Sequence, residues 1–172
     1  MNAETKTTGI MSLIAEIKKC EEADATLAAI ALCFICIDAM AYAAMPPHQT
    51  KNTGQDFMDW VDKYLKADMQ QPYQYDGKDI WAARCGYLHT FSASSDYHEK
   101  HEGIVTLSYH DGTGHIFDKA ITPDLVVLGV QSFSDDITKA VLAFLTEAND
   151  DVDRQSVVTH RLDSFFASYP IQ

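Results

Sequence analysis

The chain has 172 residues, of which 47% are hydrophobic and 22% are charged, and these are ordinary values for one globular domain. Its formal net charge is −12, because 25 acidic residues oppose 13 lysines and arginines. No run of basic residues is present to follow a phosphate backbone, so the sequence argues against extended binding of DNA or RNA. A small local site that binds RNA or a nucleotide remains compatible with this composition. We therefore expect a single acidic domain over residues 1–172.

The N-terminal residues and the cysteines favour a cytoplasmic location. Residues 1–6 lack a basic segment followed by an apolar core, so we expect no signal peptide. The cysteines lack the regular spacing of a secreted disulfide scaffold, so we expect reduced thiols. They are Cys20, Cys33, Cys36 and Cys85.

Residues 25–45 raise the question of a membrane span. They contain a single charge, Asp38, and are long enough to cross a bilayer. The charge inside the segment and its many alanines favour a helix buried in a bundle instead, with Cys33 and Cys36 as core thiols. We therefore expect no membrane segment.

Apolar residues recur at helical spacing through the first half of the chain. Residues 10–22 form the first predicted helix, and residues 25–45 form the second, which Pro46 and its neighbouring proline end. Thr53, with an acidic residue three positions later, is typical of the start of a third helix. Asp76 is a candidate N-cap for a fourth helix. Their aromatic residues are assigned to the core.

The hydrophobic period changes after residue 104. Residues 105–110 alternate between apolar and polar side chains, which is strand spacing. The Asp-Gly-Thr-Gly sequence at 111–114 predicts a tight turn, from which residues 115–117 return as the second strand of a hairpin. Residues 125–128 are a short apolar run that is either a third strand or a buried connector.

Two further helices follow, one capped by Ser134 and one that opens at residues 150–153 and ends near Pro170. The predicted fold is therefore mainly α. It is a bundle of about six helices with an inserted β-hairpin or small meander at about residues 104–128.

Arg84 lies on the apolar stripe of the helix that follows Asp76. Burying a guanidinium group is costly unless it is paired, and Asp38 is the candidate partner. His89 follows Arg84 by five positions, at the end of the same helix. Five positions correspond to about 140° around a helix. We therefore expect Arg84 and His89 to act at one point only in a homodimer, or where the last helical turn uncoils.

This Arg-x4-His arrangement, late in a helix of a small bundle, resembles the HEPN superfamily (higher eukaryotes and prokaryotes nucleotide-binding domains). The resemblance implies a toxin-like, metal-independent endoribonuclease that works as a homodimer without a cofactor. It implies that Arg84 binds the scissile phosphate and that His89 is the general base or acid at the ribose 2′-hydroxyl. Guanidinium and imidazole groups suit these two roles. Cys85 stands where superfamily members often carry Asn, Asp or His, so a degenerate relative is the accompanying prediction.

Two alternatives stay open from the residues. Arg154 and His160 form a second match to the motif, with five residues between them, and the sequence does not decide which pair is meaningful. The chain also fits a non-catalytic module that binds a protein or a nucleotide. In that module Arg84 and Asp38 are a structural pair, and the acidic surface meets a basic partner.

The third hypothesis is a metal site in the histidine-rich region that follows the fourth helix. Two of its histidines are three positions apart, and two flank the predicted hairpin turn. The four candidate ligands are His98, His101, His110 and His115.

Overall fold

The computed structural model describes residues 8–166, and the predictions that involve residues 1–6 and Pro170 lie outside that range. The described residues are mainly helical with a small two-stranded sheet, which confirms the predicted fold class. In chain order the elements are α1 (Thr8–Glu22), α2 (Thr26–Ala44), α3 (Gly54–Tyr64), α4 (Gly77–Thr90), α5 (Asp96–Lys100), β1 (Thr106–His110), β2 (Leu125–Gly129), α6 (Val130–Asn149) and α7 (Val152–Leu162).

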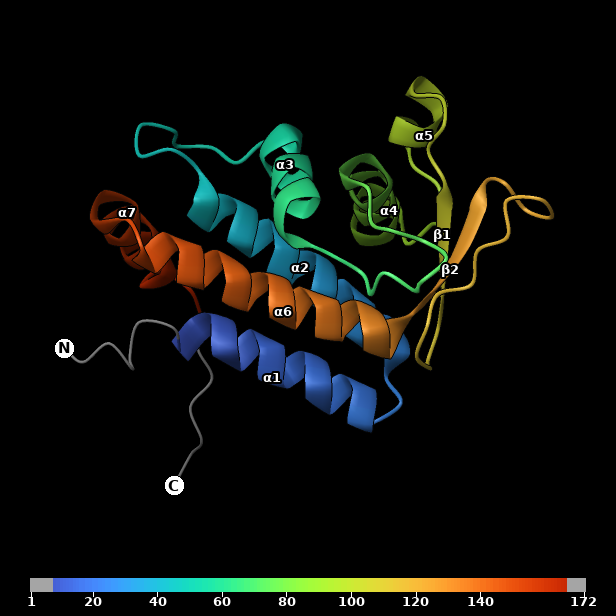
Figure 1. Cartoon of the computed structure of the whole chain (residues 1–172), viewed down its shortest axis with the longest axis horizontal. Helices are drawn as coiled ribbons and strands as arrows, with labels where there is room; N and C mark the ends of the chain where they lie inside the picture. Colours follow the sequence, from blue (N-terminus) through green and yellow to red (C-terminus); the bar gives the residue numbers. More distant parts are fainter. Residues whose placement is uncertain (1–7, 167–172) are drawn as a thin grey trace.

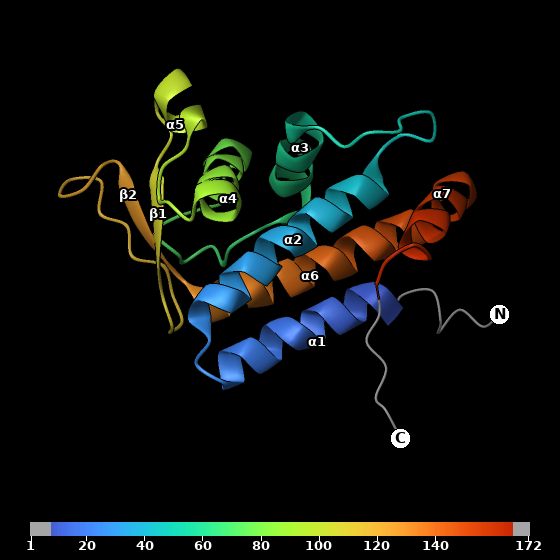
Figure 2. The ribbon, with the colours of Figure 1, turned by 180° about the vertical axis from the view of Figure 1, so that it is seen from behind.

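Helix α2 is the centre of the molecule. It packs against α1, α3, α4, α6 and α7. Figures 1 and 2 show α1, α2 and α6 running side by side, with α3 and α4 crossing over one side of α2. By length and composition α2 could cross a membrane. Because five helices of the same domain cover it, α2 is the core helix of a globular protein.

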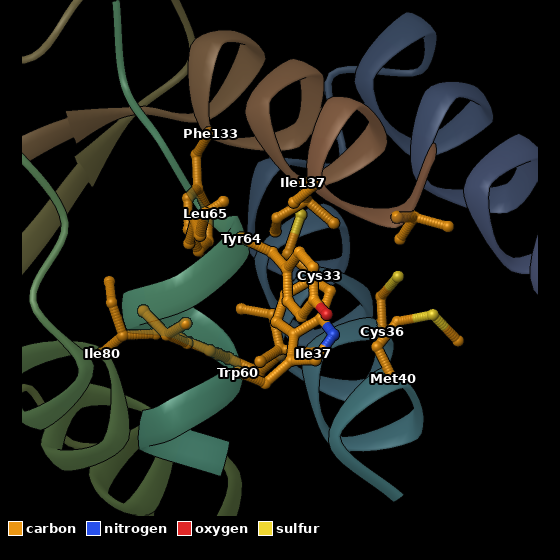
Figure 3. Close-up of a cluster of buried hydrophobic side chains, with 14 of the residues drawn as sticks. Cys33, Cys36, Ile37, Met40, Trp60, Tyr64, Leu65, Ile80, Phe133 and Ile137 are labelled. Atoms are coloured by element: carbon orange, nitrogen blue, oxygen red, sulfur yellow. The ribbon is translucent and has the colours of Figure 1, made fainter. Parts of the chain in front are cut away.

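The core forms where α2, α3 and α6 meet (Figure 3). Trp60 and Tyr64 of α3 pack on each other with their ring centroids 5.5 Å apart. Cys33 and Cys36 of α2 are completely buried free thiols. Burial raises the pKa of the Cys36 thiol to about 12. The two cysteines are therefore packing residues, as the sequence predicts.

Local sequence explains where α3 begins. The Thr53 hydroxyl accepts a hydrogen bond from the backbone N–H of Asp56, and the Asp56 carboxylate accepts one from the backbone N–H of Thr53. This reciprocal cap satisfies two donors that a helix end leaves free. It orients α3, whose buried face rests on α2.

The strand pairing differs from the predicted hairpin. Strand β1 pairs in parallel with β2, in a register that aligns Thr106 with Leu125 and His110 with Gly129. Ile116, in the segment predicted to return as a strand, forms only an isolated antiparallel bridge with Val127. The apolar run of β2 becomes the partner of β1 because it is buried between β1 and α6, as parallel strands usually are.

The start of α6 also differs from the prediction. The helix begins at Val130, directly after β2, so Ser134 lies inside it rather than at its N-cap. The buried Ser134 hydroxyl instead bonds to Glu21 of α1 and accepts a hydrogen bond from Lys18 at 2.9 Å. The residue therefore joins two helices, a role that a local capping pattern does not reveal.

Arg161 of α7 closes the C-terminal end of α2. Its buried guanidinium donates to the carbonyl oxygen of Pro46 at 2.8 Å and to that of Met45. Both carbonyls lie just beyond the last residue of α2, and that of Pro46 also accepts from the backbone N–H of Gln49 at 3.1 Å. A cation at this end suits the helix dipole. The contact ties the last helix of the described chain to the core helix.

Candidate functional site

Arg84 and Asp38 form the predicted pair between α4 and α2. The Arg84 Nε and Nη2 atoms donate to Asp38 Oδ2 at 2.9 and 2.7 Å. The two side chains are 17% and 25% exposed, so the pair lies at the edge of the core. Asp38, the lone charge in the middle of α2, thereby fixes the direction of the Arg84 side chain.

Arg84 also contacts His89 within the same chain. Arg84 Nη1 lies 2.8 Å from His89 Nε2. A guanidinium group has only donors, so Nε2 accepts this bond and the neutral ring carries its hydrogen on Nδ1. The expectation that contact needs a homodimer or an uncoiled turn is wrong, because α4 stays helical to Thr90 and the long Arg84 side chain covers the angular offset. His89 itself is exposed.

Burial and charge act in opposite directions at this site. Burial raises the pKa of Asp38, while the hydrogen bonds from Arg84 oppose that rise. Burial likewise raises the pKa of Cys85, against the effect of Arg84. Cys85 is therefore a thiol and not a nucleophilic thiolate at neutral pH. The guanidinium of Arg84 also lies 5.2 Å from the centre of the Trp81 ring.

A pocket of about 480 Å³ opens between α4 and α5, next to His89. Its size is within the range of pockets that hold small ligands. Trp81, assigned to the core from sequence, packs on Phe57 and also faces this pocket. Lining residues include Trp81, Cys85 and His89 of α4, and Tyr97, Glu99 and Lys100 of α5. The arrangement places an imidazole and aromatic rings at one opening to solvent.

Arg154 and His160, the second match to the motif, do not form an equivalent pair. Arg154 donates to Glu147 and, at 2.7 Å, to the hydroxyl of Tyr64. Hydrogen bonds from Lys63 and Arg154 lower the pKa of Glu147 to about 2. Within residues 8–166 no hydrogen bond joins Arg154 to His160. Arg84 and His89 are therefore the better candidate pair.

The four candidate metal ligands do not converge. Within residues 8–166, no group of three or more His, Cys, Asp or Glu side chains is placed to hold a metal ion. Each histidine has its own partner: His98 Nδ1 accepts from Ser95, His101 stacks on Tyr97, His110 Nε2 bonds to Gly114 and His115 Nε2 bonds to Tyr75. The predicted hairpin would have aligned His110 with His115. It does not form, because β1 pairs in parallel with β2 instead.

His115 belongs to a buried polar network that sequence reasoning missed. Its Nδ1 accepts from the backbone N–H of Gly129, so its Nε2 carries the hydrogen and donates to Tyr75 Oη at 2.7 Å. Tyr75 Oη donates in turn to Asp136 Oδ2 at 3.1 Å. Burial lowers the pKa of His115. The network connects the β insert to α6. A local sequence pattern could not predict it, because its members are far apart in the chain.

Comparison of the chain with protein-family models, with curated proteins and with solved structures gives no match. The candidate site of this chain consists of Arg84, His89 and Asp38 with the pocket beside His89.

Proposed function

We propose that this chain is a cytoplasmic HEPN-like protein that cleaves RNA without a metal ion, with Arg84 and His89 as its catalytic pair. The observation that carries the proposal is the 2.8 Å contact between Arg84 Nη1 and Nε2 of His89, which lines an open pocket. Asp38 supports the pair because it holds Arg84 by two hydrogen bonds. Imidazole can take the proton of a ribose hydroxyl and guanidinium can stabilise charge on the phosphate, so the two groups together suit phosphodiester cleavage.

The chemistry follows from the neutral state of His89. An entering phosphate competes for Arg84 Nη1, which frees the lone pair of His89 Nε2. That nitrogen takes the proton of the ribose 2′-hydroxyl, and the 2′-oxygen attacks phosphorus. The bond from phosphorus to the 5′-oxygen then breaks. The products are a 2′,3′-cyclic phosphate and a 5′-hydroxyl, whose proton comes from solvent. His89 then releases to solvent the proton that it took, in each copy of the proposed homodimer.

The test is cleavage of single-stranded RNA by the purified protein in the presence of EDTA. We expect products that end in a 2′,3′-cyclic phosphate. His89→Ala is expected to slow the reaction by at least about 100-fold, the usual contribution of a general base. His160→Ala is the matched control, because that exposed histidine has no contact with Arg84. Equal cleavage by the original protein and by His89→Ala would refute the proposal.

A second candidate is a non-catalytic module that binds a protein or a nucleotide. One observation favours it: Arg84 uses Nε, Nη1 and Nη2 in bonds within its own chain, as a structural residue would. In this case Arg84→Ala lowers the melting temperature by several degrees, while the protein with His89→Ala behaves like the original in every assay. A melting temperature unchanged by Arg84→Ala would count against this candidate.

A further inference from the structure

Phe91 ends α4 in a conformation that is unusual for its residue type. Its backbone has φ 51° and ψ 42°, in the left-handed region. Glycine usually occupies this position after a helix, because a Cβ atom is unfavourable there. In residues 8–166 the other non-glycine residue with positive φ is Asp24, whose short polar side chain tolerates that region. A bulky aromatic residue in this region is therefore the exception in the described structure.

Packing does not account for Phe91. Its side chain is 70% exposed, although it is a large apolar ring. Its aromatic contact is with Tyr87, at 5.4 Å between ring centroids and with the ring planes at 66°. Backbone strain and an exposed ring both oppose stability, and residues that combine them are found at functional sites.

The position of Phe91 relates it to the candidate site. It follows His89 by two residues, which span at most about 7 Å of chain. It also borders a hollow of about 200 Å³ that Tyr87 and Leu107 help to line. The net charge of −12 repels phosphate groups, so charge contacts with a long run of phosphates are unfavourable. Contacts that do not depend on charge avoid this repulsion, and stacking of bases on aromatic rings is such a contact.

We propose that Phe91 is a stacking platform for an unpaired nucleobase next to the phosphate bound at Arg84 and His89. The ring is 70% exposed, so an unpaired base can reach it from solvent. The inference rests on the proposed function, because it assigns part of the RNA to the same site. It requires no catalysis, so it can be tested separately from cleavage.

The test is the affinity of the protein for a fluorescein-labelled, single-stranded 12-nucleotide RNA whose riboses are 2′-O-methylated and cannot be cleaved. Fluorescence anisotropy in EDTA gives the affinity. We expect Phe91→Gly to weaken binding by at least about five-fold, the lower end for loss of one base stack. Phe91→Tyr keeps a ring and is expected to bind like the original. Phe91→Leu keeps the strain and the apolar character without a ring, and it is expected to bind like Phe91→Gly.

The melting temperature separates a binding role from a structural one. Glycine relieves the strain at this position, so Phe91→Gly is expected to melt at the same temperature as the original protein or higher. Unchanged RNA affinity in Phe91→Gly, or equal affinity in Phe91→Leu and Phe91→Tyr, would overturn the proposal. So would sedimentation showing that the loss of affinity reflects dissociation of a dimer. If the protein binds this RNA through Phe91 but does not cleave unmodified RNA, the proposed catalysis is refuted and the stacking proposal stands.

Discussion

Replacing Arg84 with Met removes the two hydrogen bonds to Asp38 and leaves that carboxylate, 25% exposed, without its cation. Leaving one member of a fully buried ion pair unpaired costs about 3–5 kcal/mol. Partial exposure of Asp38 lets water replace some of that interaction, so we expect a loss of about 2 kcal/mol in the free energy of unfolding. For a domain of this length, that loss lowers the melting temperature by about 4–8 °C.

The pH dependence of this loss identifies its cause. Burial already raises the pKa of Asp38, and Arg84 opposes that rise, so removing Arg84 raises the pKa further. A carboxyl group whose pKa is higher in the folded state than in the unfolded state contributes stability at low pH. That stability is lost as the pH rises through the folded-state value. The deficit of Arg84→Met is therefore expected to be largest at pH 7 and to shrink toward pH 4, where protonated Asp38 needs no cation.

Thermal denaturation followed by circular dichroism between pH 4 and pH 8 measures both effects. Lys19→Met is the matched control, because Lys19 pairs with Glu16 on the surface of α1, where side chains are 66% and 43% exposed. That change is expected to leave the melting temperature within about 1 °C. A deficit for Arg84→Met that stayed constant across this pH range would refute the assignment to Asp38.

Two further predictions concern the buried polar contacts. Because burial lowers the pKa of His115, its contribution to stability is present above the unfolded-state value of about 6.5 and is lost as the pH falls below it. The melting temperature of the original protein is expected to drop between pH 7.5 and pH 5.5, and His115→Gln to flatten that slope; equal slopes would show that another group titrates. Arg161→Met removes the side-chain donor of the Met45 carbonyl, while the Pro46 carbonyl keeps the backbone N–H of Gln49, and we expect a loss of about 2 kcal/mol in chemical denaturation. An unchanged unfolding midpoint would mean that water replaces the guanidinium.

Sequence patterns predicted the elements whose causes are local. The apolar run with its single Asp38 predicted a central helix and its need for a cation, and the spacing after Thr53 predicted the capped start of α3. Both depend on residues close in sequence. The pairing of Asp38 with Arg84 could be proposed because each is a charge on an apolar helix surface and needs a partner there.

The remaining features depend on contacts between distant residues. Alternation and turn residues suggested a hairpin at 105–117, but the partner of β1 is decided by which segment is most completely buried, namely β2. The helical angle between positions 84 and 89 predicted that their side chains diverge. The prediction failed because it took no account of the length of the Arg84 side chain, which reaches His89. His115 looked like a metal ligand, since its partners Tyr75 and Asp136 come from other parts of the chain.

The contact of Arg161 with the end of α2 has a consequence for biosynthesis. The core helix is among the first segments made, yet the guanidinium that closes it comes from α7. A nascent chain therefore keeps the carbonyl of Met45 open to water until residue 161 has been synthesised. Fragments that stop before α7 would carry an unfinished core helix. Premature termination is thus expected to yield products that cellular proteases remove rather than a smaller working protein.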